Sequence, residues 1–212
     1  MELKISIVTC SDTRDLAQDE AGAALEELIV AQGWTVASHV VVRDDASEIG
    51  DAIVEAADEC HANVVFTCGG TGLSMRDVTP EATRAVCDRD VPGIAEAIRA
   101  YSMTKTRRAM LSRAVCMQRG HTLVINFPGS TKAARESWEA VSDQLEHAAQ
   151  MTAGGGHTKW AHYLRRSDLA SRSAFLHSDS AERPETIGKR KLSDEKSLSL
   201  TLFAQKYNLF TE

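Results

Sequence analysis

Apolar residues recur along the first 150 residues of the chain at two different spacings. A spacing of two, or a short unbroken apolar run, is typical of a strand, whereas a spacing of three to four is typical of a helix. The strand pattern occupies residues 3–9, 35–42, 63–67 and 122–127, and the helix pattern occupies residues 21–32, 47–59 and 130–147. Because strands and helices alternate, the sequence predicts an α/β fold with a mostly parallel sheet and helices on both faces.

Each predicted helix has one apolar face. These faces consist of Ala21, Leu25, Leu28 and Ile29 in the first helix and Ile49, Ile53, Ala56 and Ala57 in the second. The third helix is expected to begin with Ser130 as its N-cap and to run to about His147. A further helix is expected after residue 78, with Thr79 as its cap and Pro80 at its first position.

The sequence Gly69-Gly70-Thr71-Gly72 directly follows the apolar run at residues 63–67, which reads as a strand buried on both faces. Glycines allow backbone N–H groups to approach a ligand closely, and a helix start adds partial positive charge. The segment therefore favours an anion such as phosphate. The alternative, a tight strand-to-helix turn without a ligand, is open for this motif taken alone.

An acid follows the glycines at Asp77, beside Arg76, where a carboxylate is not needed for folding and could hold Mg²⁺ among phosphates. No Gly-Lys-Ser/Thr follows at the spacing of a Walker A loop, and the segment is not a G-x-G-x-x-G fingerprint. A P-loop NTPase and a Rossmann dehydrogenase are therefore disfavoured.

Polar segments also follow the other predicted strands, and the carboxyl ends of parallel strands are where such sheets bind ligands. These segments contain Ser11, Asp12, Thr13, Asp44, Asp45, Pro128, Gly129, Ser130 and Lys132. Asp44 and Asp77 could share a metal ion or act on a transferred phosphoryl group. In the alternative interpretation, Asp44 or Asp45 caps the next helix, Asp77 supports the Thr79 cap, and Ser130 and Lys132 are only a cap and a surface residue.

Composition is typical of a soluble globular protein of 212 residues with one main domain. Residues 1–156 have a net charge of −9 and residues 157–212 of +3, which gives the total of −6. We therefore expect no nucleic-acid partner, and attraction of an anion would rest on local groups such as Arg76, Arg113 and Lys132. No apolar run approaches the ~20 residues of a membrane span, so a cytoplasmic protein without a membrane partner is expected.

The five cysteines are widely spaced and contain no C-x-x-C pair, so they are expected to be reduced, partly buried small hydrophobic residues. A glycine break at residues 154–156 suggests a boundary between a domain at 1–153 and a C-terminal extension at 154–212. In this extension Trp160, Tyr163 and Leu164 would share a helical face, and Leu198, Leu200 and Leu202 alternate as in a short strand. We interpret it as a partly flexible or packing arm.

Four motifs occur in an order that resembles the MoaB/MogA-like molybdopterin-binding domain family over about residues 3–150. They are VTCSDT at residues 8–13, GGTG with RDVTPEAT at residues 69–72 and 76–83, AMLSR at residues 109–113, and NFPGSTKA at residues 126–133. The resemblance implies a Rossmann-like three-layer homotrimer that binds molybdopterin and Mg-ATP. It would transfer AMP to the terminal phosphate of the pterin and release pyrophosphate.

The resemblance also implies roles for individual residues. Asp44 and Asp77 match the acids of Mg²⁺-dependent catalysis, and Ser112 matches the serine of the Leu-Ser-Arg motif. The remaining residues expected at the substrates are Ser11, Asp12, Thr13, Gly69, Gly70, Thr71, Gly72, Arg76, Thr79, Arg113, Pro128, Gly129, Ser130 and Lys132. Molybdopterin and ATP would be the small-molecule partners, with possible hand-over of the product to a molybdenum-insertion protein.

One position departs from the family pattern, because Met75 stands where many relatives have proline. Two alternatives accompany the resemblance. The residues at 128–133 also suit a MoaB branch whose members bind molybdopterin without adenylating it, as a carrier would. The superfamily further includes competence-damage-type nucleotide pyrophosphatases, a second enzyme activity.

Overall fold

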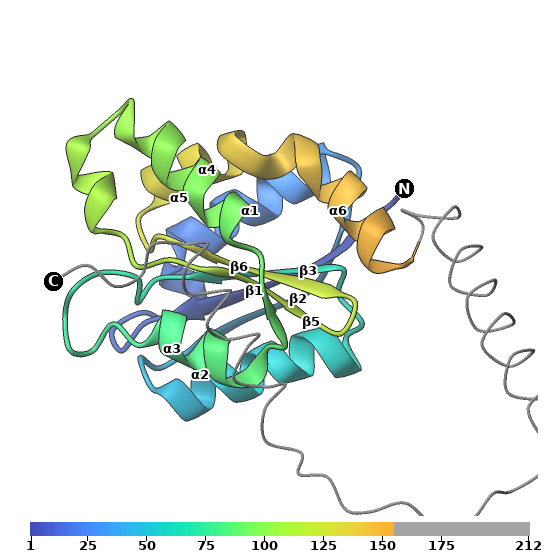
Figure 1. The fold of residues 1–212 in the computed structure, drawn as a ribbon. Coiled ribbons are helices and arrows are strands. Elements are labelled where there is room, and N and C mark those ends of the chain that lie inside the picture. The colour runs from blue at the N-terminus through green and yellow to red at the C-terminus, as the bar shows by residue number, and fades with distance from the viewer. Residues whose placement is uncertain (155–212) are drawn as a thin grey trace, which may run out of the picture. The chain divides into compact units, whose positions relative to one another are not determined.

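The computed structural model describes residues 1–154, which form a six-stranded sheet between two layers of helices (Figure 1). The strands are β1 (Lys4–Cys10), β2 (Thr35–Val42), β3 (Val64–Cys68), β4 (Arg89–Asp90), β5 (Cys116–Arg119) and β6 (Thr122–Phe127). The expectations for residues 155–212, including the helical face and the short strand, lie outside the described residues.

The sheet has the strand order β2-β1-β3-β6-β5-β4. Strands β2, β1, β3 and β6 are parallel to one another, while β5 pairs with β6, and β4 with β5, in antiparallel fashion. Parallel pairing brings the carboxyl ends of β1, β2, β3 and β6 to one edge. The predicted mostly parallel sheet is therefore confirmed, and its carboxyl edge collects the polar segments.

Helices cover both faces of the sheet, as predicted. One layer contains α1 (Glu20–Ala31), α4 (Pro92–Met103), α5 (Thr131–Val141) and α6 (Leu145–Thr152), and the other contains α2 (Ala46–Val54) and α3 (Thr79–Val86). Short helical turns at Leu16–Gln18, Arg107–Leu111 and Ser142–Gln144 are 3₁₀, and a π-helical turn at Glu55–Glu59 continues α2.

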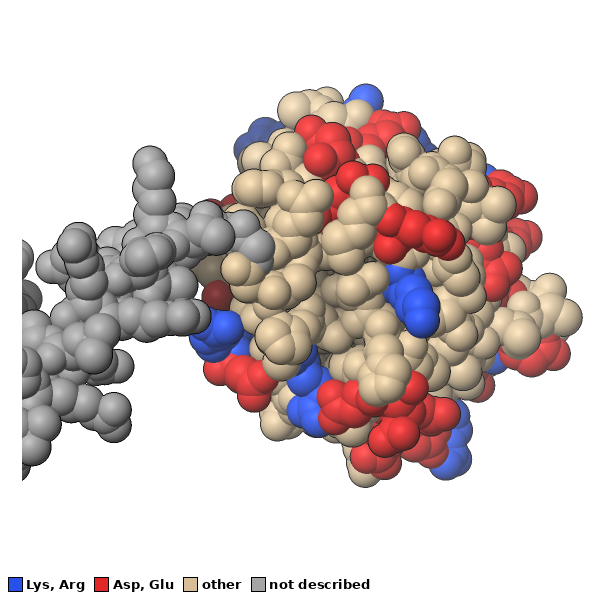
Figure 2. All heavy atoms as spheres, turned by 90° about the vertical axis from the view of Figure 1, so that its right-hand side faces the viewer, with Lys and Arg blue, Asp and Glu red and all other residues tan. Residues whose placement is uncertain are grey.

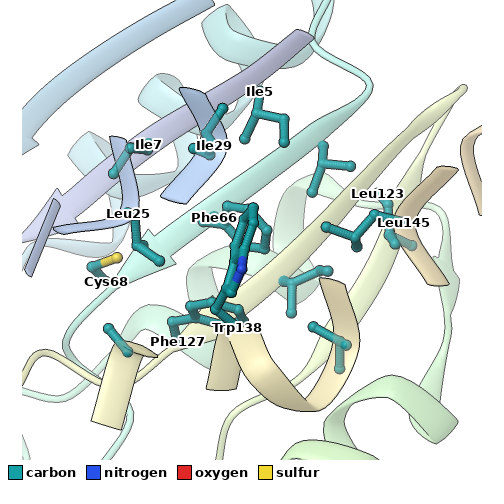
Figure 3. Packing of buried hydrophobic residues seen from close by; sticks show 14 of the residues in the cluster. Ile5, Ile7, Leu25, Ile29, Phe66, Cys68, Leu123, Phe127, Trp138 and Leu145 are labelled. Carbon is teal, nitrogen blue, oxygen red and sulfur yellow. The ribbon is translucent and has the colours of Figure 1, made fainter. Parts of the chain in front are cut away.

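The larger core lies between the sheet and the layer that contains α1 and α5 (Figure 3). Phe66 of β3 packs against Phe127 of β6 and Trp138 of α5, with ring centroids 4.5 Å and 5.9 Å apart. Ile29 of α1 is fully buried in the same core, near Ile5 and Ile7 of β1. All five residues of β3 are buried, as expected for a strand covered on both faces.

Several predicted boundaries were wrong. The helix expected to extend to His147 is interrupted by the 3₁₀ turn at Ser142–Gln144, so α5 and α6 are separate. The pattern at residues 87–121 was too weak to predict β4, α4 and β5, because β4 has two residues and α4 has few buried positions. Both predicted apolar faces are confirmed, with Leu28 only partly buried.

None of the helices in residues 1–154 is long and apolar enough to cross a bilayer. All five cysteines fall in this range and are free, with Cys10, Cys68 and Cys116 buried, as expected for reduced small hydrophobic residues. Acidic and basic side chains are interspersed on the face shown in Figure 2, rather than gathered into one basic surface.

Candidate anion-binding site

A cavity of about 430 Å³ lies at the carboxyl edge of the sheet. We call it the carboxylate cavity, because Asp12, Asp44 and Asp77 line it. Its other lining residues are Cys10, Ser11, Thr13, Arg14, Gly69, Gly70, Thr71, Gly72, Ser74, Arg76 and Gly129. The structure thus brings together residues from the segments after β1, β2, β3 and β6, which the sequence predicted would meet.

The glycine loop, defined here as residues 69–78, leaves β3 with two glycines in the left-handed region. Gly69 has φ +112°, and a Cβ there would lie 2.5 Å from the carbonyl oxygen of Cys10. Gly70 has φ +61°, and a Cβ there would lie 2.2 Å from Thr79 Oγ1. Side chains at these positions would both strain the backbone and collide with neighbouring atoms, so the loop requires glycine.

Thr79 does not cap α3, contrary to the prediction. The N-cap position is Val78, without a side-chain hydrogen bond, and Thr79 is the first helical residue. Its backbone N–H donates to Gly70 O at 3.2 Å, so Thr79 fastens the glycine loop through its main chain. The fully buried Thr79 hydroxyl has no hydrogen-bond partner among the described residues. It lies under Gly70, and Thr79 does not line the cavity.

Asp44 lies directly against the glycine loop, and Asp77 belongs to it. Asp44 Oδ1 is 3.4 Å from the position of a Cβ on Gly70, and Asp77 Oδ2 is 2.9 Å from that of a Cβ on Gly72. Burial, and next the neighbouring carboxylate of Asp12, raise the pKa of Asp44, and Asp77 adds to the effect. These carboxylates therefore concentrate negative charge beside a loop suited to anions.

The alternative capping roles are only partly correct. Asp45 is the N-cap of α2 and accepts from the N–H groups of Ser47 and Glu48 at 2.9 and 3.1 Å, which leaves Asp44 free of that task. Asp77 supports the glycine loop instead of a Thr79 cap, because Oδ2 accepts from the Ser74 N–H at 2.8 Å. The second carboxylate oxygen of Asp77, Oδ1, takes no part in this hydrogen bond.

The two arginines of the predicted set have different surroundings. Arg76 forms an ion pair with Asp12 across the carboxylate cavity. Arg113 lies behind the glycine loop, where Nε donates to Gly72 O at 2.7 Å, Nη2 donates to Asp77 O, and Nη1 pairs with Glu81. Arg113 does not line the cavity, so it supports the loop and is not the local cation for an anion that the sequence suggested.

A second cavity of about 290 Å³ adjoins the first, because Thr71 and Gly72 line both. We call it the apolar cavity after Ile98, Ala109 and Leu111 in its wall. The predicted residues Ser112 and Pro128 line the apolar cavity and not the carboxylate cavity. Its remaining lining residues are Arg99, Ser102, Thr106, Arg108, Ala114, Ala133, Glu136 and Ser137.

Four predicted residues line neither cavity: Thr79 and Arg113, described above, and Ser130 and Lys132. Ser130 is the N-cap of α5, with Oγ accepting from the Ala133 N–H at 3.4 Å, which confirms its predicted structural role. The Lys132 side chain is 87% exposed and lies 4.0 Å from Glu136, one helical turn further along. It behaves as the surface lysine of the alternative interpretation.

The segment between β1 and α1 is anchored by Asp19, whose side chain is fully buried. Its carboxylate accepts from Thr9 Oγ1 at 2.5 Å and from the Gly22 N–H at 3.0 Å, and it lies 2.8 Å from His39 Nε2. Burial by itself would raise the pKa of Asp19, but these hydrogen bonds outweigh it and lower that pKa. The anchor holds one wall of the carboxylate cavity to β1 and β2.

Sequence reasoning missed Cys10, Arg14 and Ser74 in the carboxylate cavity. Burial raises the pKa of the Cys10 thiol to about 12, so it contributes a neutral side chain. Arg14 follows the Ser11-Asp12-Thr13 segment directly, and that adjacency was the one available signal. Residues 1–154 contain no group of three or more His, Cys, Asp or Glu arranged to hold a metal ion by themselves.

The fold and the site define a three-layer α/β protein with a polar cavity at the carboxyl edge of its sheet. The family described as "Probable molybdopterin binding domain" matches residues 6–147. "Molybdenum cofactor biosynthesis protein B" of Bacillus cereus is 39% identical over 136 residues, which is 63% of this chain and 80% of the relative. "Molybdopterin adenylyltransferase" of Escherichia coli is 37% identical over 145 residues, 66% of this chain and 74% of the relative.

Solved structures agree with these relatives. The crystal structure of the molybdopterin biosynthesis enzyme MoaB from Thermus thermophilus is 41% identical in sequence, with a TM-score of 0.66. The match covers 72% of this chain and 97% of that one. The chain belongs to the molybdopterin-binding domain family, as its four sequence motifs predicted.

Proposed function

We propose that this protein acts in molybdenum cofactor biosynthesis as a molybdopterin adenylyltransferase. In this reaction the terminal phosphate of molybdopterin attacks the α-phosphorus of ATP. The bond from that phosphorus to the bridging oxygen breaks, and pyrophosphate leaves. One observation carries the proposal: a carboxylate-lined cavity at a glycine loop adjoins an apolar cavity through Thr71 and Gly72. Two substrates can therefore meet at the loop.

The residues of the carboxylate cavity fit a magnesium ion that arrives with ATP. Mg²⁺ is usually held by one or two carboxylates together with substrate phosphates and water. Asp44 and Asp77 supply these carboxylates, and burial, followed by the neighbouring carboxylates of Asp12 and Asp77, raises the pKa of Asp44. When bound, Mg²⁺ would neutralise charge on the phosphates and help to align them.

The protein's own groups orient the substrates. The main chain of Gly70 and Gly72 lines the carboxylate cavity, where its N–H groups can donate to phosphate oxygens, whereas the Gly69 N–H donates to Phe127 O at 3.0 Å. Asp77 is held in place by its bond from the Ser74 N–H, and Arg113 fixes the other side of the same loop. The carboxylates need not act as bases, because a phosphate nucleophile is largely deprotonated near neutral pH. Positioning and charge neutralisation therefore carry the reaction.

The apolar cavity suits the pterin part of molybdopterin. Ile98, Ala109 and Leu111 offer apolar surface, while Ser102, Thr106 and Ser112 add hydroxyl groups in its wall. Ligand sites typically combine an apolar lining with a few polar groups that fix orientation. A pterin in this cavity would direct its phosphate through the boundary at Thr71 and Gly72 toward the carboxylates.

A non-catalytic molybdopterin carrier is the second candidate function. It is favoured by the likeness to proteins named for cofactor biosynthesis without a stated adenylyltransferase activity, such as the B. cereus relative. A carrier requires the apolar cavity but no magnesium-binding carboxylates. The proposal also retains the expected homotrimer and the hand-over to a molybdenum-insertion protein.

Pyrophosphate release tests the choice between these functions. Purified protein is mixed with Mg-ATP, with and without molybdopterin, and the Asp77→Asn variant is compared with Asp51→Asn. Asparagine at 77 can still accept from the Ser74 N–H, so the loop should keep its fold while the charge is lost. Asp51 is an exposed residue of α2 outside both cavities, so its variant removes the same charge elsewhere.

We expect the wild type and Asp51→Asn to release pyrophosphate only when molybdopterin is present. In Asp77→Asn the rate of pyrophosphate release should fall by about 100-fold or more, as it does when other groups that stabilise transition-state charge are removed. Binding of molybdopterin without pyrophosphate release in the wild type would instead establish the carrier. Equal rates in both variants would refute the role of Asp77.

A further inference from the structure

Arg14 lies where two cavities meet. It lines the carboxylate cavity and also a neighbouring cavity of about 410 Å³ that extends past β2 to Arg43 and Glu48. The apolar cavity, by contrast, does not include Arg14. Arg14 therefore belongs to the carboxylate cavity and not to the lining of the proposed pterin pocket.

The Arg14 guanidinium is held at this position by the main chain. Nη1 donates to Gly129 O at 3.1 Å, across 115 residues of sequence. A Cβ on Gly129 would lie 3.1 Å from Gly69 Cα and 3.9 Å from Arg14 Nη2, so the segments after β1, β3 and β6 are closely packed here. Arg14 thus bridges two of the loops that form the site.

Arg14 forms no ion pair with the carboxylates that line the same cavity. Three carboxylates and two arginines line this cavity, and Arg76 pairs with Asp12. In residues 1–154 Arg14 forms no ion pair, and Gly129 O is the one hydrogen-bond acceptor that its guanidinium finds there. Since a guanidinium has five N–H donors, most of them remain available to a ligand. An arginine with free donors is well suited to phosphate oxygens.

We propose that Arg14 binds the polyphosphate chain of the nucleotide in the carboxylate cavity. This inference rests on the proposed function, because it requires that a nucleoside triphosphate occupies the carboxylate cavity. Arg14 would contact the phosphates that leave as pyrophosphate, while Asp44 and Asp77 would hold the magnesium ion.

The test measures ligand affinity by calorimetry for Arg14→Ala, Arg14→Lys and the control Arg135→Ala. Arg135 lies on α5, pairs with Glu27 at 3.0 Å and lines neither cavity, so its variant removes an equal charge away from the site. The probes are Mg-ATP, magnesium pyrophosphate and molybdopterin, each titrated separately. Thermal unfolding of every variant is recorded alongside, because the bond to Gly129 O is also lost.

We expect Arg14→Ala to bind Mg-ATP and magnesium pyrophosphate at least about ten-fold more weakly, since hydrogen bonds to charged groups contribute at this level. Molybdopterin affinity should be unchanged. The affinity of Arg14→Lys for the phosphate probes should lie between those of the wild type and Arg14→Ala, because lysine keeps the charge but lacks the planar set of N–H donors. Arg135→Ala should bind like the wild type.

Two results would overturn the inference while leaving the proposed function intact. One is unchanged affinity of Arg14→Ala for both phosphate probes. The other is an equal loss of affinity for molybdopterin and Mg-ATP together with a lower melting temperature, which would make Arg14 only a bridge between loops. If wild-type protein binds neither Mg-ATP nor pyrophosphate, the proposed function itself fails, and the inference falls with it.

Discussion

Replacing Arg113 with alanine would remove the support behind the glycine loop. Its guanidinium donates to the carbonyl oxygens of Gly72 and Asp77 and pairs with Glu81. The Arg113 side chain is 34% exposed, so water can replace part of what is lost. The Glu81 side chain, which pairs with Arg113, is more exposed than Arg113 itself. The hydrogen bond from Arg113 nevertheless lowers the pKa of Glu81.

The magnitude follows from these contacts. Hydrogen bonds from a charged donor contribute about 1.5–3 kcal/mol each, and an exposed ion pair contributes less than about 1 kcal/mol. With two partly exposed carbonyl bonds, we expect Arg113→Ala to destabilise the glycine loop by about 2–3 kcal/mol. At 1.4 kcal/mol for each factor of ten, this makes opening of the loop roughly 30- to 150-fold more frequent.

Amide hydrogen exchange measures this opening directly. The informative amides are those of Ser74, which donates to Asp77 Oδ2 at 2.8 Å, and Asp77, which donates to Ser74 O at 3.0 Å. Both should exchange faster in Arg113→Ala, whereas amides of β1 and β3 should change little. The matched control is Arg135→Ala, which removes an exposed pair on α5. Exchange at Ser74 and Asp77 within two-fold of the wild type would refute a supporting role for Arg113.

Two further predictions concern the backbone and the buried acid. Gly70→Ala should destabilise the protein by more than about 2 kcal/mol and abolish Mg-ATP binding, because Gly70 has φ +61° and its Cβ would collide with Thr79 Oγ1. Denaturant unfolding would check this against Gly33→Ala, which has φ +77° but open space around its Cβ; equal losses would show that only backbone strain matters. Asp19→Asn should be less stable than the wild type at pH 7 and approach it below about pH 4. A lowered carboxyl pKa stabilises the fold above the unfolded value of about 3.9, and this contribution is lost as pH falls through the folded pKa. A deficit that stays constant from pH 7 to pH 3 in urea titrations would contradict the charged role of Asp19.

Long regular elements were predictable because their pattern repeats over many residues. The buried positions of α1, at Ala21, Leu25 and Ile29, repeat every four residues, and β3 is a continuous apolar run. The antiparallel end of the sheet was not predictable in the same way. In β4, Arg89 and Asp90 are both exposed, so no apolar pattern marks the strand, and only pairing with β5 defines it.

The site was predictable as a set of segments but not residue by residue. The parallel order of strands implied that Asp12, Asp44 and Asp77 would gather at one edge, and all three line the carboxylate cavity. The direction of single side chains could not be read from the chain. Lys132 and Ser130 belong to a predicted segment, yet one is exposed on α5 and the other caps that helix.

What the sequence determined by itself is local: periodicity specified the main helices and strands, and their alternation specified the parallel sheet. It also determined the loops in which ligand-binding groups occur, because polar segments follow the strand ends. Only the tertiary structure decided which arginines face the carboxylate cavity: Arg14 and Arg76 line it, and Arg113 does not. Arg14 reaches across 115 residues of sequence to Gly129 O, and Arg113 lies behind the glycine loop. The physical reason is that a long side chain takes its direction from the acceptors around it, and packing of distant segments determines where those acceptors lie.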